Sequence, residues 1–247
     1  MFPYNTMMIS RFFFPETVPH GGTLELPEAL AHHAVRVLRL RVGEPLVLFD
    51  GQGGEAHAVL VEAGKRCTVE VSAWHALERE SPVSIVLVQA LASADKMDWI
   101  VRKAVELGVS AIQPVQAARS VLRLSGERMY KRVAHWQQIV VSACEQSGRN
   151  RVPAVAPVLA LPDYLRQSDG VQRLICMPEA GRRLSTLERP EGTLHVLIGP
   201  EGGWTEEEMA ACVAAGASGI GLGPRVLRTE TAGLAVLAAA QALWGDF

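Results

Sequence analysis

From residue 84 onward, the apolar residues alternate between short strand-like runs and stretches with helical spacing. Ser84–Leu91 is a nearly continuous apolar run, and the residues after it repeat at helical intervals: Met97, Ile100, Val101, Ala104 and Leu107. Further strand-like runs lie at 111–115, 173–177, 194–198 and 219–222, and a second helical face comprises Met129, Val133, Trp136, Val140 and Ala143. Thr205 and Glu208 form the capping-box pattern of a helix start, with Gly216 as a stop. This alternation predicts an α/β fold with a largely parallel sheet.

The residues before about 80 carry a different pattern. Glu44–Phe49 is an apolar run, Asp50–Gly54 is rich in glycine, and Glu55–Val61 is a second apolar run, which together predict a β-hairpin. Thr68–Val71 alternates with period two, as a half-buried strand does. We therefore expect a small β module, barrel-like in form, over residues 1–80 and an α/β domain over 81–247, with the boundary in the charged, proline-terminated segment 77–82.

Positive charge is concentrated in the middle of the chain. The 24 Lys and Arg residues against 26 Asp and Glu residues give a net charge of −2, yet residues 96–151 carry 10 basic and 4 acidic side chains. Clustered Lys and Arg residues are typical of a surface that binds a phosphate backbone, whereas the alternative is a set of solvated helix faces. A smaller basic cluster, His32–Arg41, lies in the otherwise acidic first third.

Several classes of protein are not supported by the composition. The chain has no run of about 18 apolar residues and no basic leader before an apolar block, so neither a membrane span nor export is expected. The four cysteines, at 67, 144, 176 and 212, are too dispersed for a zinc cluster, and standard dinucleotide, P-loop and metalloprotease motifs are absent from the sequence. We expect a soluble, cytoplasmic protein that uses no metal.

Three glycine-containing segments follow predicted strands: Met177–Gly181, Gly199–Gly203 and Leu222–Ala232. Parallel α/β sheets bind ligands beyond the carboxyl ends of their strands, and glycines let a ligand approach the backbone. Any one of these segments by itself is compatible with a plain tight turn. Three of them after neighbouring strands favour a binding pocket.

The segments Leu197–Gly203 and Leu222–Ala232 resemble the signature of the RsmE family of SPOUT methyltransferases. Supporting stretches extend over nearly the whole chain: Arg36–Arg39, Phe49–Gly51, Lys96–Met97, Lys103–Val109 and Cys144–Pro153. The resemblance implies a bacterial enzyme that uses S-adenosylmethionine to methylate N3 of one uridine in 16S ribosomal RNA of the small subunit, leaving S-adenosylhomocysteine. It also implies a PUA-like β-barrel, a C-terminal domain with the SPOUT trefoil knot, and a homodimer without a DNA or membrane partner.

This resemblance, together with the basic stretches and the chemistry of the implied reaction, suggests roles for individual residues. The predicted cofactor-binding residues are Met177, Pro178, Glu179, Leu197, Ile198, Gly199, Pro200, Glu201, Gly202, Gly203, Leu222, Gly223, Val226, Leu227, Arg228 and Thr229. The catalytic candidates are Arg228, Glu230, Arg149 and Glu145, and the predicted RNA-binding residues are Arg11, Arg36, Arg39, Lys96, Arg119, Arg123, Arg149 and Arg151.

Simpler roles remain open for two of these residues, and other functions remain open for the chain. Glu145 could simply balance the charge of Arg149, and Glu230 could simply stabilise the first turn of the last helix, without a role in catalysis. A related enzyme acting on another base or on a ribose 2′-oxygen, an RNA-binding assembly factor with a vestigial pocket, and a metabolic α/β enzyme are the alternatives.

Overall fold

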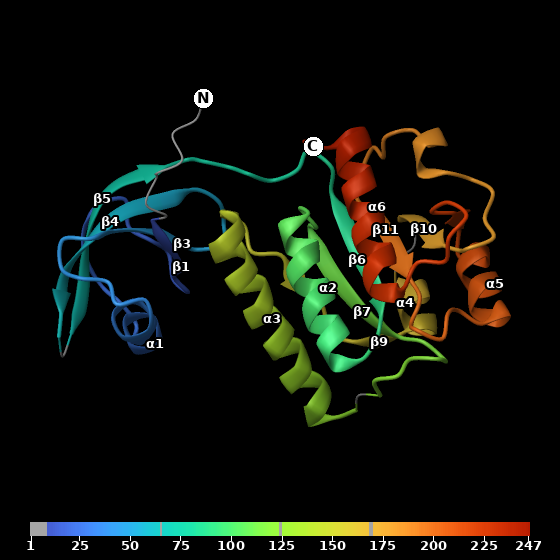
Figure 1. Ribbon diagram of the computed structural model, residues 1–247, viewed down its shortest axis with the longest axis horizontal. Coiled ribbons are helices and arrows are strands. Elements are labelled where there is room, and N and C mark those ends of the chain that lie inside the picture. The colour runs from blue at the N-terminus through green and yellow to red at the C-terminus, as the bar shows by residue number, and fades with distance from the viewer. Residues whose placement is uncertain (1–8, 65, 124, 168–169) are drawn as a thin grey trace. The chain divides into compact units, whose positions relative to one another are not determined.

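The computed structural model describes residues 9–64, 66–123, 125–167 and 170–247 (Figure 1). The chain forms two compact units. The first comprises the residues up to Glu80 together with Cys144–Val152, and the second comprises Ser81–Ala143 and Pro153–Phe247. The segment Cys144–Val152, which the sequence analysis assigned to the α/β domain, is therefore a part of the first unit.

The first unit is a five-stranded sheet with one short helical segment. Its elements are β1 (Ser10–Phe13), β2 (Gly22–Glu25), α1 (Glu28–His32), the π-helical turn η1 (His33–Val37), β3 (Pro45–Phe49), β4 (Glu55–Ala63) and β5 (Cys67–His75). The strand order is β1-β3-β4-β5-β2, in which β1 pairs with β3 in parallel and the other pairs are antiparallel. The predicted hairpin is confirmed as β3 and β4.

Two sequence patterns explain this unit. Gly51, Gly53 and Gly54 have positive φ angles of 83°, 109° and 71°, so the tight connection from β3 to β4 depends on glycine. Along β4, Ala56, Ala58 and Leu60 alternate into the core, where they pack with residues of the other strands such as Phe12, Leu48 and Val69.

The second unit contains the α/β elements. They are β6 (Ile85–Ala90), α2 (Ala94–Glu106), β7 (Ala111–Gln116), α3 (Glu127–Ser147), β8 (Ala154–Val155), β9 (Leu159–Ala160), α4 (Leu161–Gln167), β10 (Gln172–Cys176), the 3-10 turn η2 (Leu184–Thr186), β11 (Leu194–Ile198), α5 (Glu206–Ala214), β12 (Ala217–Ile220) and α6 (Thr229–Trp244). The last four residues of α3 belong to the first unit. The sheet order is β12-β10-β11-β6-β7-β8, with β9 also on β7, and these strands pair in parallel.

Helices cover both faces of this sheet, which explains why the central strands β6 and β11 are mostly apolar on both faces. On one side Leu87 and Ile198 lie close to Gly233 of α6. On the other side Val88 and Ala90 pack in a cluster with Leu161 and other residues of α4 and α5. Helices α2 and α3 lie next to each other (Figure 1), and Asp98 of α2 accepts a hydrogen bond of 3.1 Å from the Trp136 indole of α3.

The predicted strands and helices of this unit are confirmed, with shifts of one or two residues in β10 and β12. The Thr205–Glu208 capping box is present, and Gly216 ends α5 with φ of +86°. Strand β12 begins at Ala217 rather than at the expected Gly219, because it follows Gly216 directly. In the described residues, none of the helices has both the length and the apolar character needed for a membrane crossing.

Candidate functional site

A cavity of about 660 Å³ lies in the second unit at the carboxyl ends of β10, β11 and β12. Three loops supply most of its wall, namely those after β10, after β11 and between β12 and α6. Its lining residues are Lys96, Cys176, Met177, Pro178, Glu179, Ile198, Gly199, Pro200, Glu201, Gly203, Trp204, Glu206, Met209, Ile220, Leu222, Gly223, Arg225, Val226, Leu227, Arg228, Thr229 and Ala232. A volume of this size is typical of a small-molecule or cofactor site.

Close backbone contacts bring the loops together. A Cβ atom on Gly221 would lie 2.3 Å from the carbonyl oxygen of Ala180, and one on Gly199 would lie 3.2 Å from the indole nitrogen of Trp204. The absence of a side chain at these two positions is what allows the loop after β10 and the ring of Trp204 to approach so closely. The glycines therefore shape the cavity through packing as well as through backbone freedom.

A buried hydroxyl joins the last helix to the loop after β11. Thr229, the first residue of α6, donates a hydrogen bond of 2.5 Å from Oγ1 to the carbonyl oxygen of Gly199. The same hydroxyl accepts a hydrogen bond of 3.0 Å from Nε2 of Gln89, a fully buried residue of β6. Gln89 lies in β6 and Gly199 directly follows β11. Thr229 therefore fixes the start of α6 to both strands beside the cavity.

Lys96 of α2 lies between two carboxylates at the cavity. Its ammonium is 3.6 Å from Oε1 of Glu201 and 3.2 Å from Oε2 of Glu230. Glu201 also accepts a hydrogen bond of 3.0 Å from the backbone N–H of Ser93, the N-cap residue of α2. Partial burial would raise the pKa of Glu201, but the Ser93 N–H and the Lys96 charge outweigh it and lower that pKa. Glu201 is therefore held as an ion that anchors the loop after β11.

Most of the predicted cofactor-binding residues line this cavity, the exceptions being Leu197 and Gly202. Leu197 is fully buried in the core, and Gly202 lies against the side chain of Arg119. Trp204, Glu206 and Met209 also line it but were not predicted from the sequence. Their signal was the capping box at Thr205, which starts α5 directly after the glycine loop and so places its first turn beside that loop.

The four catalytic candidates are divided between the units. Arg228 is exposed at the N-cap of α6 and lines the cavity, and Glu230 contacts the cavity residue Lys96. Glu145 and Arg149 belong to the first unit, where Glu145 accepts a hydrogen bond of 3.1 Å from the Phe13 N–H and Arg149 is buried against Glu80. Burial raises the pKa of Glu145, although the Phe13 hydrogen bond partly offsets this effect.

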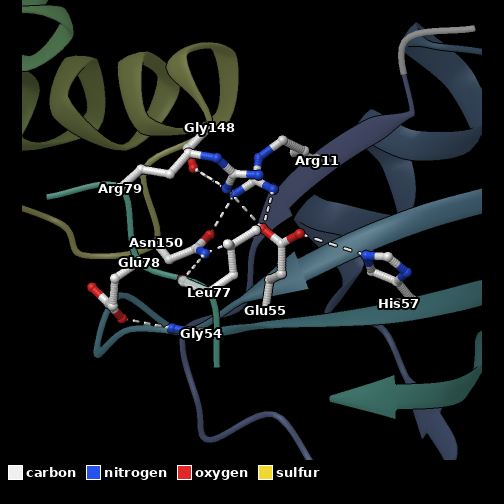
Figure 2. Close-up of polar contacts among 9 residues, drawn as sticks. All are labelled: Arg11, Gly54, Glu55, His57, Leu77, Glu78, Arg79, Gly148 and Asn150. Carbon is white, nitrogen blue, oxygen red and sulfur yellow. Dashed lines mark hydrogen bonds and ion pairs between the residues drawn. The ribbon is translucent and has the colours of Figure 1, made fainter. Parts of the chain in front are cut away.

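Figure 2 shows a polar cluster around Glu55 in the first unit. The buried carboxylate of Glu55 is 2.6 Å from Arg11 and 3.1 Å from Arg79, and it accepts a hydrogen bond of 3.1 Å from Asn150. Burial would raise the pKa of Glu55, but these hydrogen bonds and charges lower it to about 2. Asn150 is fully buried and also donates to the carbonyl oxygen of Leu77, so the cluster joins Cys144–Val152 to the sheet of the unit.

The predicted RNA-binding residues have different surroundings. Arg36 and Arg39 are exposed and have no ion-pair partner in the described parts of the chain, and Arg39 has the left-handed φ of +58°. Arg151 is paired with Glu78, and Arg123 donates to the carbonyl oxygen of Ala118. The other four already have partners within the protein. Arg11 pairs with Glu55, and Arg149 pairs with Glu80. Lys96 pairs with Glu201 and Glu230, and Arg119 donates to the carbonyl oxygen of Gly202.

Comparison with known proteins agrees with this geometry. The RNA methyltransferase domain family matches residues 79–241, and the RNA methyltransferase PUA domain family matches residues 26–72. The chain is 32% identical to ribosomal RNA small subunit methyltransferase E of Bacillus subtilis over 244 residues, which cover 94% of this chain and 95% of the relative. It is 35% identical to the Mycobacterium bovis protein of the same name over 242 residues, which cover 94% and 91%.

Two solved structures share the whole architecture. The ribosomal RNA small subunit methyltransferase E of Neisseria gonorrhoeae, solved with S-adenosyl methionine bound, has a TM-score of 0.91 and 43% identity and covers 97% of this chain and 99% of its own. A Legionella pneumophila protein solved with bound SAM has a TM-score of 0.93 and 33% identity and covers 98% and 100%. With its PUA-type first part, its SPOUT α/β part and these relatives, the chain belongs to the ribosomal RNA small subunit methyltransferase E family.

Proposed function

We propose that this protein transfers the methyl group of S-adenosylmethionine to N3 of one uridine in the 16S rRNA of the small ribosomal subunit. The observation that carries the proposal is the convergence of three glycine-containing loops on one cavity at the carboxyl edge of the parallel sheet. The named relatives act on small subunit ribosomal RNA, and the Neisseria gonorrhoeae relative binds S-adenosyl methionine in that fold.

The residues of the cavity fit this cofactor. The volume of about 660 Å³ suits a ligand of its size, and Leu222 and Leu227 offer apolar walls for an adenine ring. Backbone groups of the two loops at Gly203 and Gly223, which are exposed and line the cavity, would hold its polar edges. When bound, the cofactor supplies a methyl group already activated by a positively charged sulfur. The protein then has to position the uracil and control the proton on its N3.

Arg228 and Glu230 are the residues that we assign to this task. The N3–H of uridine is weakly acidic, so methylation needs a proton acceptor or a cation that stabilises the uracil anion. Arg228 lines the cavity and is exposed, which leaves its guanidinium available to the base, with Arg225 as a second cation. Glu230, in the first turn of α6 beside the cavity residue Lys96, is proposed as the proton acceptor. Roles in catalysis for Glu145 and Arg149 stay predictions.

The first unit is proposed to position the RNA. N3 lies on the Watson–Crick edge, so the target base must be unpaired or extruded from its helix. The exposed Arg36 and Arg39 are suited to backbone phosphates, and Arg151 of the same unit and Arg123 of the second unit have exposed side chains for the same purpose. Because residues 1–95 carry 7 basic and 11 acidic side chains, we expect weak binding of short RNA and recognition of the folded subunit.

A methyl-transfer assay tests the proposed function. Small subunits from cells that lack this protein would be incubated with the full chain and labelled S-adenosylmethionine, and the nucleosides would then be analysed. We expect N3-methyluridine, with far less product from a short oligonucleotide of the target sequence. A ribose methyl group, another methylated base or no transfer at all would overturn the proposal. The homodimer and the cytoplasmic location stay predictions, and sedimentation of the purified chain tests the first.

A further inference from the structure

Residues 117–123, the segment that follows β7, contact residues 199–204, the loop after β11. Arg119 donates from Nη1 to the carbonyl oxygen of Gly202 at 3.0 Å and to that of Trp204 at 3.4 Å. The stem of the same side chain packs on the glycine, because a Cβ atom on Gly202 would lie 3.0 Å from Cβ of Arg119. Arg119 thus makes both polar and packing contacts with residues 199–204.

A second contact fixes the same segment to α5. The backbone N–H of Ala118 donates to Oε1 of Glu208 at 2.7 Å. The other oxygen of Glu208 accepts from the Thr205 N–H at 3.0 Å and so closes the capping box at the start of α5. One carboxylate therefore ties the helix start to the residue next to Arg119.

The segment is also held internally, so it can act as a rigid support. Ser120 is buried and accepts a hydrogen bond of 3.0 Å from the Ala117 N–H. Arg123 donates to the carbonyl oxygen of Ala118 at 2.9 Å. These bonds fix the backbone on both sides of Arg119.

The supported loop forms one wall of the cofactor cavity. Gly203 and Trp204 line the cavity, and the Trp204 ring lies over Gly199, whose carbonyl oxygen accepts the Thr229 hydrogen bond. We propose that Arg119 is a positioning residue for the cofactor: by holding the carbonyls of Gly202 and Trp204 it keeps this wall in its binding shape. The inference rests on the proposed function, because it concerns the same cavity.

This role differs from the phosphate contact predicted for Arg119 from the basic stretch of the sequence. Both hydrogen bonds come from the same nitrogen, Nη1, whose two N–H groups suit it to two carbonyls at once. If Arg119 only contacted RNA phosphates, its removal would weaken RNA binding and reduce the salt dependence of that binding, and cofactor binding would be unchanged. If it positions the loop, cofactor binding falls without any RNA present.

Calorimetric titration of S-adenosylmethionine into the full chain without RNA separates these outcomes. We expect Arg119→Ala to weaken binding roughly tenfold and Arg119→Lys, which keeps the charge but loses the planar guanidinium that places Nη1, roughly threefold. Arg128→Ala removes the same charge from an exposed position in the first turn of α3 and should stay within about twofold of wild type. The Michaelis constant for the small subunit at saturating cofactor should not change in Arg119→Ala.

Wild-type affinity in a folded Arg119→Ala chain would overturn the inference. Folding is checked by near-ultraviolet circular dichroism, and if Arg119→Ala does not fold, wild-type affinity in Arg119→Lys overturns it instead. Failure of the wild-type chain to bind S-adenosylmethionine would contradict the proposed function itself. Binding by wild type with equal binding by Arg119→Ala would contradict only the role of Arg119.

Discussion

Lys96 and Glu230 form an ion pair of 3.2 Å that joins α2 to the first turn of α6 at the edge of the cofactor cavity. The same ammonium is 3.6 Å from Glu201 in the loop after β11. Three elements that are distant in sequence therefore share one cation. Since two carboxylates face each other across it, the cation offsets their mutual repulsion.

Replacing this cation should loosen the cavity. We expect Lys96→Met to weaken S-adenosylmethionine binding about fivefold, because partly exposed ion pairs contribute about 1 kcal/mol. Lys96→Arg, which keeps a cation, should retain most of the affinity. Lys103→Met is the matched control, since Lys103 lies on the same helix and pairs only locally with Glu106 at 2.8 Å. Equal losses in Lys96→Met and Lys103→Met would contradict a specific role for the pair at the cavity.

Arg228 should be needed for turnover rather than for folding. Its side chain is exposed at the cavity, so Arg228→Ala should lower kcat by about 100-fold or more through loss of charge stabilisation, with an unchanged unfolding curve. Arg182→Ala, an exposed arginine outside the lining, provides the control and should keep wild-type kcat. Methylation of small subunits by Arg228→Ala at close to the wild-type rate would remove Arg228 from the catalytic residues.

The Thr229 hydroxyl should stabilise both the fold and the cavity. Thr229→Val keeps the shape but leaves the Gly199 carbonyl without its 2.5 Å donor, which should cost about 1–3 kcal/mol of unfolding free energy in urea and also weaken cofactor binding. Thr231→Val, two residues later on an exposed position of α6, should cost less than about 0.5 kcal/mol. The prediction fails if the two valine variants have the same stability.

Glu55 should make the first unit sensitive to acid. Its pKa is lowered from 4.5 to about 2, so its contribution to stability is fully present above pH 4.5 and is lost as the pH falls toward 2. The shift corresponds to about 3 kcal/mol at neutral pH. Glu55→Gln should therefore unfold more easily at pH 7 and lose less stability than wild type between about pH 5 and pH 3.

Hydrogen exchange measures this effect. The protection of the backbone amides of Cys144–Val152 is followed as the pH is lowered. Glu62→Gln, an exposed glutamate on the same strand, serves as the control and should follow the wild-type pH dependence. An identical acid response in wild type and Glu55→Gln would show that the carboxylate does not link Asn150 to the sheet.

Local patterns were sufficient for much of the fold and of the cavity. Strand β11 occupies the predicted residues Leu194–Ile198, and the capping box at Thr205 and the hairpin around Asp50–Gly54 are present. These features depend on periodicity and on neighbouring residues, which a sequence displays directly. The loops that follow parallel strands could be placed together as well, because parallel strands end at one edge of a sheet.

The partners of charged side chains depended on tertiary structure. Arg11 and Arg149 were predicted to act on RNA or in catalysis because of their charge, and the structure pairs them with Glu55 and Glu80, which are 44 and 69 residues away along the chain. The sequence contains each charge but not the distance to the opposite one. It therefore specified the hairpin, most of the longer elements of the α/β unit and the loops that meet there. Folding alone decided which arginines support the protein and which remain exposed to a ligand, because ion pairing acts through space and not along the chain.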